Sequence, residues 1–149
     1  MDIKIRKGTP EDVPQVFQLV QELAVYEKAA DQVTNTPEKM LEDGFGPHPI
    51  YGLLVAEADG KIVGISMYYT RYSTWKGKRL YLEDLIVTES MRGYGMGKML
   101  LDATVAEARA TDCTGVMWQV LDWNEPSVKF YERYGARLDG EWINCHLDF

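Results

Sequence analysis

The order of apolar and polar residues predicts strands and helices along most of the chain. Residues 3–6 alternate apolar and charged side chains, as a half-buried strand does. Apolar residues then recur at helical spacing, and Pro14 places the start of the regular helix near Val13. The threonine and proline at residues 36–37 form a cap-and-proline signal, which predicts a second, short helix that stops at Gly44.

The rest of the chain predicts five further strands and two further helices. Asp59–Gly60 is a strong hairpin turn between two strands. The expected strands cover residues 51–58, 61–72, 79–88, 115–121 and 141–149, and the expected helices cover residues 96–110 and 124–135. The resulting order, β-α-α-β-β-β-α-β-α-β, indicates one α/β domain over residues 1–149 with a mixed sheet.

Composition and charge narrow the classes of function. The chain has 149 residues, of which 46% are apolar, and a formal net charge of −7. An acidic surface disfavours nucleic acid as a partner and suits a cationic small molecule. No run of apolar residues is long enough to span a membrane, and the N-terminus lacks the apolar segment of a secretory signal. The two cysteines fit no metal or redox spacing, so we expect a cytoplasmic protein without a metal site.

The segment RGYGMGKML, residues 92–100, is the strongest chemical signal from spacing alone. It is not a dinucleotide fingerprint, because the sixth position counted from Gly93 is Lys98. It is not a P-loop either, because that motif needs glycine at position 92 and Ser or Thr at position 99. Successive amides at the start of a helix favour an anion, so a diphosphate fits here. A glycine-rich turn without a ligand is the alternative.

Arg92-x-x-Gly95-x-Gly97 after an apolar strand resembles the acetyl-CoA loop of the GNAT N-acetyltransferase superfamily. The segments ELAVYEK, YSTWKGK and LDWNEPSVKFYERYGA are similar to the spermidine/spermine and thialysine acetyltransferase branch, and YSTWKGK and LDWN are closer to the thialysine type. The similar blocks extend from Glu22 to Ala136. The resemblance implies a three-layer GNAT fold with a central mixed sheet, acetyl-CoA as donor, a primary amine as acceptor and a homodimer.

The resemblance also implies which residues hold acetyl-CoA. Main-chain groups of one strand would pair with the pantetheine arm, and the glycine loop would hold the pyrophosphate. A plain core strand is the alternative for residues 85–87, and a helix N-cap, which is compatible with cofactor binding, is the alternative for Asn124. The implied set is Leu85, Ile86, Val87, Arg92, Gly93, Tyr94, Gly95, Met96, Gly97, Lys98, Asn124, Ser127 and Tyr131.

Two residues are implied for catalysis, Tyr131 and Glu83. Tyr131 matches the general acid of the family, and an unperturbed tyrosine, with a pKa of about 10, is protonated at neutral pH. Packing of its helix against the sheet is the alternative role. Glu83 matches the position at the acceptor amine, whose pKa of about 10.4 makes deprotonation at neutral pH cost roughly 4 kcal/mol. We expect Glu83 to anchor the amine and to begin a water relay.

The implied acceptor residues are Tyr26, Glu27, Trp75, Glu83 and Asp84. Adjacent strand residues point to opposite faces, so Asp84 is expected not to share the task of Glu83. Tyr26 and Trp75 offer aromatic faces to a cation. A solvated helix end is the alternative for Glu27, and residues 43–46 form either a loop over the acceptor cleft or a plain turn.

The sequence departs from the polyamine-type relatives in two places. Ser73 and Thr74 stand before Trp75, where those relatives carry an aspartate, which weakens spermidine as a substrate. The segment between Leu138 and Trp142 is shorter, which leaves open whether Glu141 completes the acceptor site.

These observations predict acetyl-CoA-dependent N-acetylation of a small primary amine by direct attack in a ternary complex. A lysine-like amino acid such as thialysine is the leading acceptor, and a short polyamine is the second. Acetylation of a protein lysine or N-terminus shares every donor feature and remains an alternative. A non-catalytic module that binds or senses acyl-CoA is a third possibility, against which the presence of Tyr131 and Glu83 argues.

Overall fold

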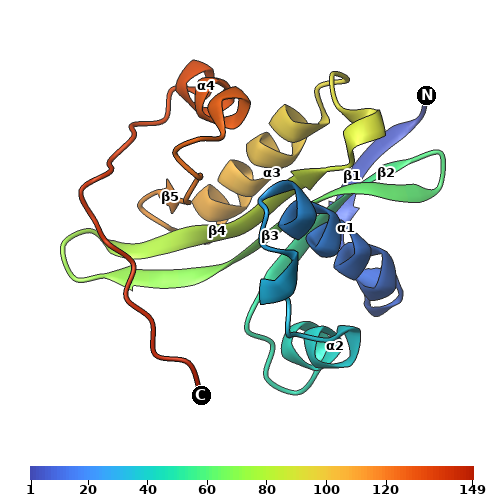
Figure 1. The fold of residues 1–149 in the computed structure, drawn as a ribbon, viewed down its shortest axis with the longest axis horizontal. Coiled ribbons are helices and arrows are strands. Elements are labelled where there is room, and N and C mark those ends of the chain that lie inside the picture. The colour runs from blue at the N-terminus through green and yellow to red at the C-terminus, as the bar shows by residue number, and fades with distance from the viewer. The chain divides into compact units, whose positions relative to one another are not determined.

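A mixed five-stranded sheet forms the centre of the protein (Figure 1). In the computed structural model, which describes residues 1–149, the strand order is β1-β2-β3-β4-β5. The first four strands are antiparallel neighbours, and β5 pairs with β4 in parallel. The predicted mixed sheet is therefore confirmed. The strands are β1 (Ile3–Lys7), β2 (Gly52–Ala58), β3 (Lys61–Ser73), β4 (Gly77–Val87) and β5 (Val116–Met117).

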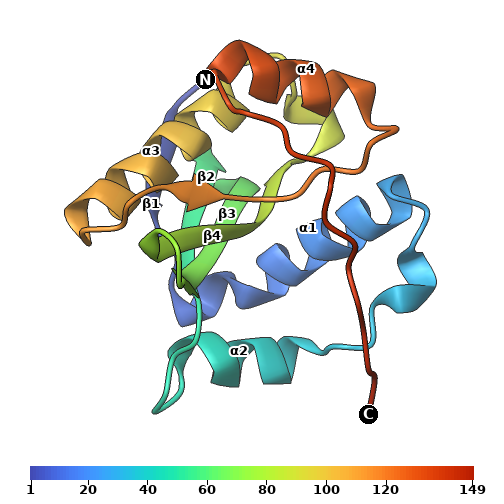
Figure 2. The ribbon, with the colours of Figure 1, turned by 90° about the vertical axis from the view of Figure 1, so that its left-hand side faces the viewer.

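Helices cover both faces of the sheet (Figures 1 and 2). The helices α1 (Val13–Tyr26) and α2 (Pro37–Phe45) pack on one face, and α3 (Met96–Ala110) packs on the other. Each face has its own apolar core, because alternate residues of a strand point to opposite sides. The core under α1 and α2 includes Val16, Phe17, Met40, Val55, Ile65, Met67 and Ile86, and the core under α3 includes Leu54, Ala56, Tyr68, Leu80, Met96 and Leu100.

The helix starts follow their capping residues. A short 3-10 turn, Pro10–Asp12, precedes α1, which begins at Val13 as predicted. The Thr36 hydroxyl accepts a hydrogen bond from the Lys39 amide at 3.1 Å and caps α2. This helix continues to Phe45, so the predicted stop at Gly44 is wrong by one residue. Gly44 lies within the last turn. Glycine fits this position because the Tyr51 ring occupies the space where a Cβ would be.

A β-bulge lies in the middle of β4. Met67 of β3 is opposite Asp84, whereas the next residue, Tyr68, is opposite Leu82. Glu83 is therefore an extra residue that has no partner in the register. A bulge of this kind bends the strand and redirects the side chains around it.

The chain folds as two compact units, Met1–Trp118 and Gln119–Phe149. The sheet and the first three helices belong to the first unit. The second unit holds α4 (Glu125–Tyr134), which is one residue shorter at each end than the predicted helix and has Gly135 as its C-cap.

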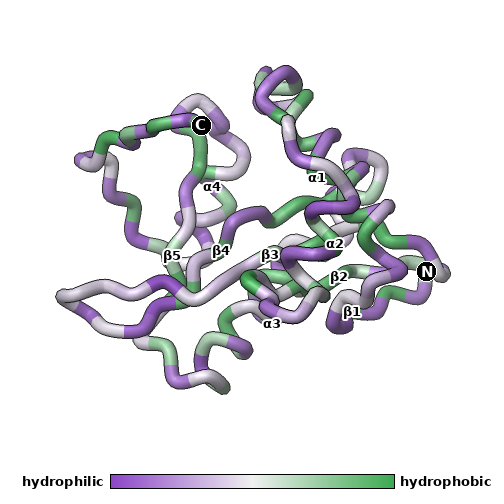
Figure 3. The backbone as a smooth tube through the Cα atoms, turned by 90° about the horizontal axis from the view of Figure 1, so that it is seen from below, coloured by the Kyte–Doolittle hydropathy of each residue, from purple (hydrophilic) through white to green (hydrophobic).

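The C-terminal strand predictions are largely wrong. Of the strand expected over residues 115–121, only Val116–Met117 forms. The strand expected over residues 141–149 does not form, although Figure 3 shows hydrophobic and hydrophilic residues interspersed along this segment. A strand needs a ladder of main-chain hydrogen bonds. Residues 119 and 144 are joined instead by one side-chain hydrogen bond of 3.0 Å, from Gln119 to Asn144.

Candidate active site

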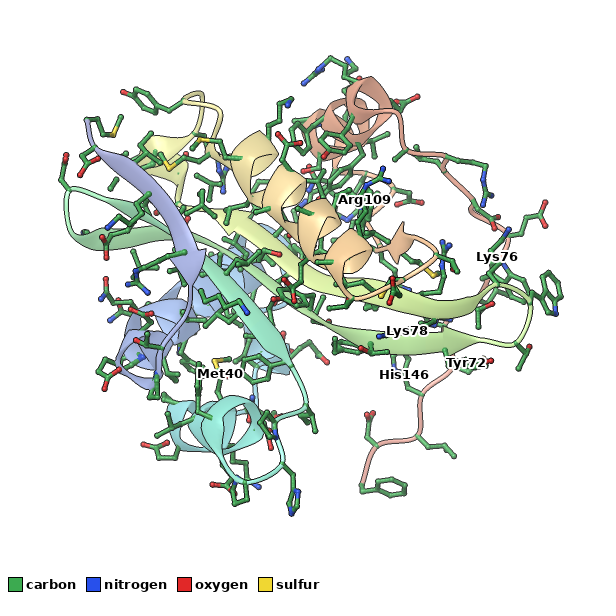
Figure 4. All side chains as sticks on the ribbon, turned by 180° about the vertical axis from the view of Figure 1, so that it is seen from behind. Met40, Tyr72, Lys76, Lys78, Arg109 and His146 are labelled. Carbon is green, nitrogen blue, oxygen red and sulfur yellow. The ribbon has the colours of Figure 1, made fainter.

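A small acidic cavity lies on the face of the sheet that α2 covers. Its volume is about 190 Å³, and it has carboxylates, aromatic rings and apolar side chains in its wall. Met40, labelled in Figure 4, lies between α2 and the sheet and is buried. The cavity is bounded by Asn35, Met40, Asp43, Ile50, Tyr51, Met67, Tyr69 and Glu83. Of these residues, the sequence predicted Glu83, and it placed Asp43 in a loop or turn over the cleft, whereas Asp43 lies in the last turn of α2.

Tyr69 fixes the Glu83 side chain at the cavity. The phenol hydroxyl donates a hydrogen bond of 3.1 Å to Glu83 Oε1. Burial and the negative charge of Glu83 raise the pKa of Tyr69 to about 12, so this hydroxyl is protonated at neutral pH and acts as the donor. The sequence did not point to Tyr69, because its relation to Glu83 depends on the register between β3 and β4.

The bulge brings Asp84 to the same face as this cavity. Asp84 is opposite Met67, and directly opposed residues share a face. Met67 belongs to the core under α1 and α2 and also borders the cavity with Glu83. The expectation that the two carboxylates point to opposite faces is therefore wrong, because it assumed a regular strand.

The pKa of the Asp84 carboxyl group is far above its ordinary value. Burial, followed by repulsion from Glu83 and Glu27, raises its pKa to about 7. Burial also raises the pKa of Glu27 above its ordinary range. Three carboxyl groups, those of Glu27, Glu83 and Asp84, therefore interact on this face, where a bound cation would relieve their repulsion.

The two aromatic residues predicted for the acceptor lie at opposite ends of β4. Tyr26 lies at the end of α1, where the Arg92 guanidinium is 5.4 Å from its ring centroid and the Arg92 Nε donates to the Val87 carbonyl at 3.0 Å. Trp75 is in the β3–β4 turn and is 86% exposed. Figure 4 shows its neighbour Lys76 at the tip of the hairpin, well separated from Met40. Since β4 has 11 residues, roughly 3.3 Å apiece, Tyr26 and Trp75 of one chain do not reach the same small molecule.

The glycine loop has the backbone that an anion site needs. Gly93 and Gly95 have φ values of 89° and 80°, in the left-handed region that favours glycine. No atom lies within 4 Å of the positions where their Cβ atoms would be, so open space faces the loop. Gly95 is the N-cap of α3, whose first-turn amides have no acceptor within the helix. The loop therefore fits a pyrophosphate group.

The charged side chains of the loop contact other groups of the protein. Arg92 is held by the Val87 carbonyl, and Lys98 pairs with Asp102 at 2.9 Å. On the preceding turn, Glu22 of α1 accepts hydrogen bonds from the Thr88 hydroxyl at 2.8 Å and from the Glu89 amide at 3.1 Å. The main-chain amides are thus the principal groups available to an anion, with the helix dipole of α3 behind them.

Part of β4 has an open edge beside this loop. The parallel pairing with β5 covers only Leu80 and Tyr81. Within the first unit, residues 82–87 have β3 on one side and no strand on the other. An extended ligand could pair with the main chain of Leu85, Ile86 and Val87 at this edge, and the pairing with a pantetheine arm stays a prediction.

The remaining predicted residues lie in the second unit. Asn124 is the N-cap of α4, but its side chain makes no capping hydrogen bond, and its carbonyl accepts from the Val128 amide at 3.0 Å. Ser127 is in the first turn of α4. Tyr131 is in the same helix, with its ring centroid 5.3 Å from that of Phe130. The roles of these residues stay predictions.

Two further features bear on the class of protein. No group of three His, Cys, Asp or Glu side chains is arranged to hold a metal ion. None of the helices is both long and apolar enough to cross a bilayer.

Comparison with known proteins defines the class. The sequence matches the Acetyltransferase (GNAT) family over residues 15–136, and the chain belongs to this family. It is 38% identical to thialysine N-epsilon-acetyltransferase of Bos taurus, over 96% of this chain and 90% of that protein. It is 37% identical to spermidine/spermine N(1)-acetyltransferase-like protein 1 of Homo sapiens, over 89% of this chain and 20% of that protein. The crystal structure of a tetramutant of the BH1408 protein from Bacillus halodurans superposes with a TM-score of 0.78 and 25% identity, over 97% of this chain and 99% of that one.

The family assignment confirms the resemblance found in the sequence. The protein is an N-acetyltransferase that acts on an amine, and GNAT acetyltransferases generally take the acetyl group from acetyl-CoA.

Proposed function

We propose that the protein acetylates a primary amine of a small cationic acceptor at the acidic cavity. A lysine-like amino acid such as thialysine is the leading acceptor, and a short polyamine is the second. The observation that carries the proposal is the Glu83 carboxylate, held by Tyr69 in the wall of the cavity. The bovine relative is a thialysine N-epsilon-acetyltransferase, which supports a lysine-like side chain as the reacting part.

In this proposal Glu83 binds the acceptor as an ammonium ion. The proton must leave before the nitrogen can attack, and for a pKa of about 10.4 this costs roughly 4 to 5 kcal/mol at pH 7. A carboxylate stabilises the cation, so Glu83 orients the amine and passes its proton to water rather than removing it unaided. Asp84 and Glu27 are further carboxyl groups near Glu83, and the hydroxyl of Tyr69 orients the Glu83 carboxylate through its hydrogen bond.

Acetyl-CoA supplies the acetyl group as an activated thioester. We propose that the main-chain amides from Gly93 to Lys98, with Arg92, hold its pyrophosphate, and that residues 85–87 pair with its extended arm. Asn124 and Ser127 complete this site, and Tyr131 donates a proton to the departing thiolate. The open edge of β4 and the left-handed glycines of the loop support the first part of this assignment.

The test is a measurement of free thiol release with acetyl-CoA and a panel of acceptors: thialysine, lysine, ornithine, putrescine, spermidine and a lysine-containing peptide. We expect the protein to turn over the small amines, and we expect a large loss of this turnover in Glu83→Gln. Glu42→Gln is the matched control, because Glu42 is an exposed carboxylate that does not border the cavity. Turnover confined to the peptide would identify a protein acetyltransferase. Binding of coenzyme A without turnover of any amine would identify a binding module.

We also propose that the protein is a homodimer. Apolar residues of the C-terminal segment are exposed in the single chain: Trp142 by 75%, Ile143 by 86% and Leu147 by 88%. Exposed apolar residues in a strand-like pattern favour association. Sedimentation velocity at micromolar concentration is expected to show twice the mass of one chain, and a monomer under these conditions would contradict the proposal.

A further inference from the structure

Asp43 is a second carboxylate in the wall of the acidic cavity, on the last turn of α2. Its position is fixed by the main chain, because its carbonyl accepts a hydrogen bond of 2.8 Å from the Ile50 amide. The Tyr51 hydroxyl donates a hydrogen bond of 2.7 Å to the Met40 carbonyl and ties the segment that follows α2 back to this helix. Neither an ion pair nor a side-chain hydrogen bond within the chain occupies the Asp43 carboxylate.

Two tyrosines connect the surroundings of Asp43 with those of Glu83. Gly52 is opposite Tyr68, and the same register carried one residue further places Tyr51 opposite Tyr69. Tyr69 contacts Glu83 on the next strand, and the charge of Asp43 acts on the Tyr51 hydroxyl. Asp43 and Glu83 border the same cavity, so a single small ligand there can face both carboxylates.

The space between the two carboxylates suits a short aliphatic chain. Met40, Ile50 and Met67 provide an apolar wall, and the Tyr51 and Tyr69 rings offer faces to a cation. The volume of about 190 Å³ is smaller than the roughly 300–1,000 Å³ of drug-sized ligand pockets. A cavity of this size suits a short chain of methylene groups rather than a bulky ligand.

We propose that Asp43 binds a second ammonium group of the acceptor while Glu83 binds the amine that is acetylated. This inference rests on the proposed function and deepens it, because it makes the enzyme selective for acceptors with two ammonium groups. Asp43 is then a specificity-determining residue that takes no part in the transfer itself. Diamines and lysine-like amino acids both carry the required pair of cations.

The test compares cadaverine with pentylamine, which has the same five-carbon chain and lacks the second ammonium group. The measured quantity is the ratio of kcat/KM for cadaverine to kcat/KM for pentylamine, obtained from thiol release with acetyl-CoA. In Asp43→Asn we expect this ratio to fall by about tenfold or more, mainly through KM for cadaverine. Glu42→Gln removes the same charge one residue away and is expected to leave the ratio unchanged, and Asp43→Glu is expected to retain most of it.

The outcomes separate this inference from the proposed function. A wild-type ratio in Asp43→Asn, with circular dichroism showing a folded protein, would refute the role of Asp43 and leave the acetyltransferase intact. An equal fall in Asp43→Asn and Glu42→Gln would also refute it, because it would show a general effect of net charge. Failure of the wild-type enzyme to acetylate any amine would instead refute the proposed function. Lysine, compared with cadaverine in the same assay, distinguishes an amino-acid acceptor from a diamine.

Discussion

Asp84→Asn is expected to make the protein more stable at neutral and alkaline pH and less active. Asp84 lies among apolar residues on the face of α1, with Glu83 and Glu27 as its charged neighbours. An asparagine has nearly the same shape and carries no charge that burial and repulsion would oppose. The substitution therefore removes the unfavourable burial and repulsion of a negative charge in the folded state. It also removes a carboxyl group that we assign to the acceptor site.

The magnitude follows from the shift in pKa. The pKa of Asp84 rises from 3.8 to about 7, or about 3 units, and each unit corresponds to about 1.4 kcal/mol, which sets an upper limit of about 4 kcal/mol. Asp84 is only partly buried in the folded chain, so its carboxyl oxygens remain within reach of water. Solvation reduces the penalty, and we expect a gain of about 1 to 2 kcal/mol at pH 8.

The pH dependence has a definite sign. Between pH 4 and pH 7 the folded protein holds the Asp84 proton while the unfolded chain has lost it, so the wild-type protein loses stability as the pH rises through this window. Asparagine does not titrate. The difference in the free energy of unfolding between variant and wild type is therefore expected to grow from pH 5 to pH 7 and to level off above it.

Urea unfolding followed by far-ultraviolet circular dichroism at pH 5, 6, 7 and 8 measures this difference. Asp31→Asn is the control, because Asp31 is an exposed carboxylate and the same chemical change there is expected to have little effect at any pH. A difference for Asp84→Asn that stayed constant from pH 5 to pH 8 would refute the reasoning, since it would show that the ionisation of Asp84 is not opposed by its surroundings.

Three further perturbations test other parts of the structure. Gly95→Ala places a side chain at a φ of 80°, which costs about 1 to 2 kcal/mol. Titration calorimetry is expected to show weaker binding of coenzyme A to this variant, and an unchanged affinity would contradict the role of the loop. Tyr69→Phe removes the hydrogen bond to Glu83 and is expected to raise KM for the amine severalfold with coenzyme A affinity unchanged, whereas an unaltered KM would show that Glu83 needs no support. Asp12→Asn weakens the paired hydrogen bonds of 2.8 and 3.0 Å with Arg6, which lower the pKa of Asp12, and is expected to destabilise the protein at pH 7 by about 1 to 3 kcal/mol. That stabilisation is present above the unfolded pKa of Asp12 and is lost as the pH falls through the lower folded value, so the loss in Asp12→Asn should shrink below about pH 4; an equal loss at pH 3 and pH 7 would argue against it.

The sequence by itself determined the features that neighbouring residues encode. Thr36 caps its helix, the Asp59–Gly60 turn has both residues at positive φ, and the glycines at 93 and 95 adopt the left-handed backbone expected of them. These conformations depend on φ preferences and short-range hydrogen bonds, which a few adjacent residues supply. The family resemblance likewise came from contiguous motifs, and the match over residues 15–136 confirms it.

The tertiary structure decided which residues meet. The bulge that turns Glu83 and Asp84 toward one face and the contact of Tyr69 with Glu83 depend on the pairing of β3 with β4. The cavity shared by Asp43 and Glu83 depends on the packing of α2 against the sheet. Alternation along a single strand predicts the wrong face for Asp84, because a bulge is a property of two strands and not of one. The segment 141–149 makes the same point, since a strand-like pattern becomes a strand only where a partner offers its main chain.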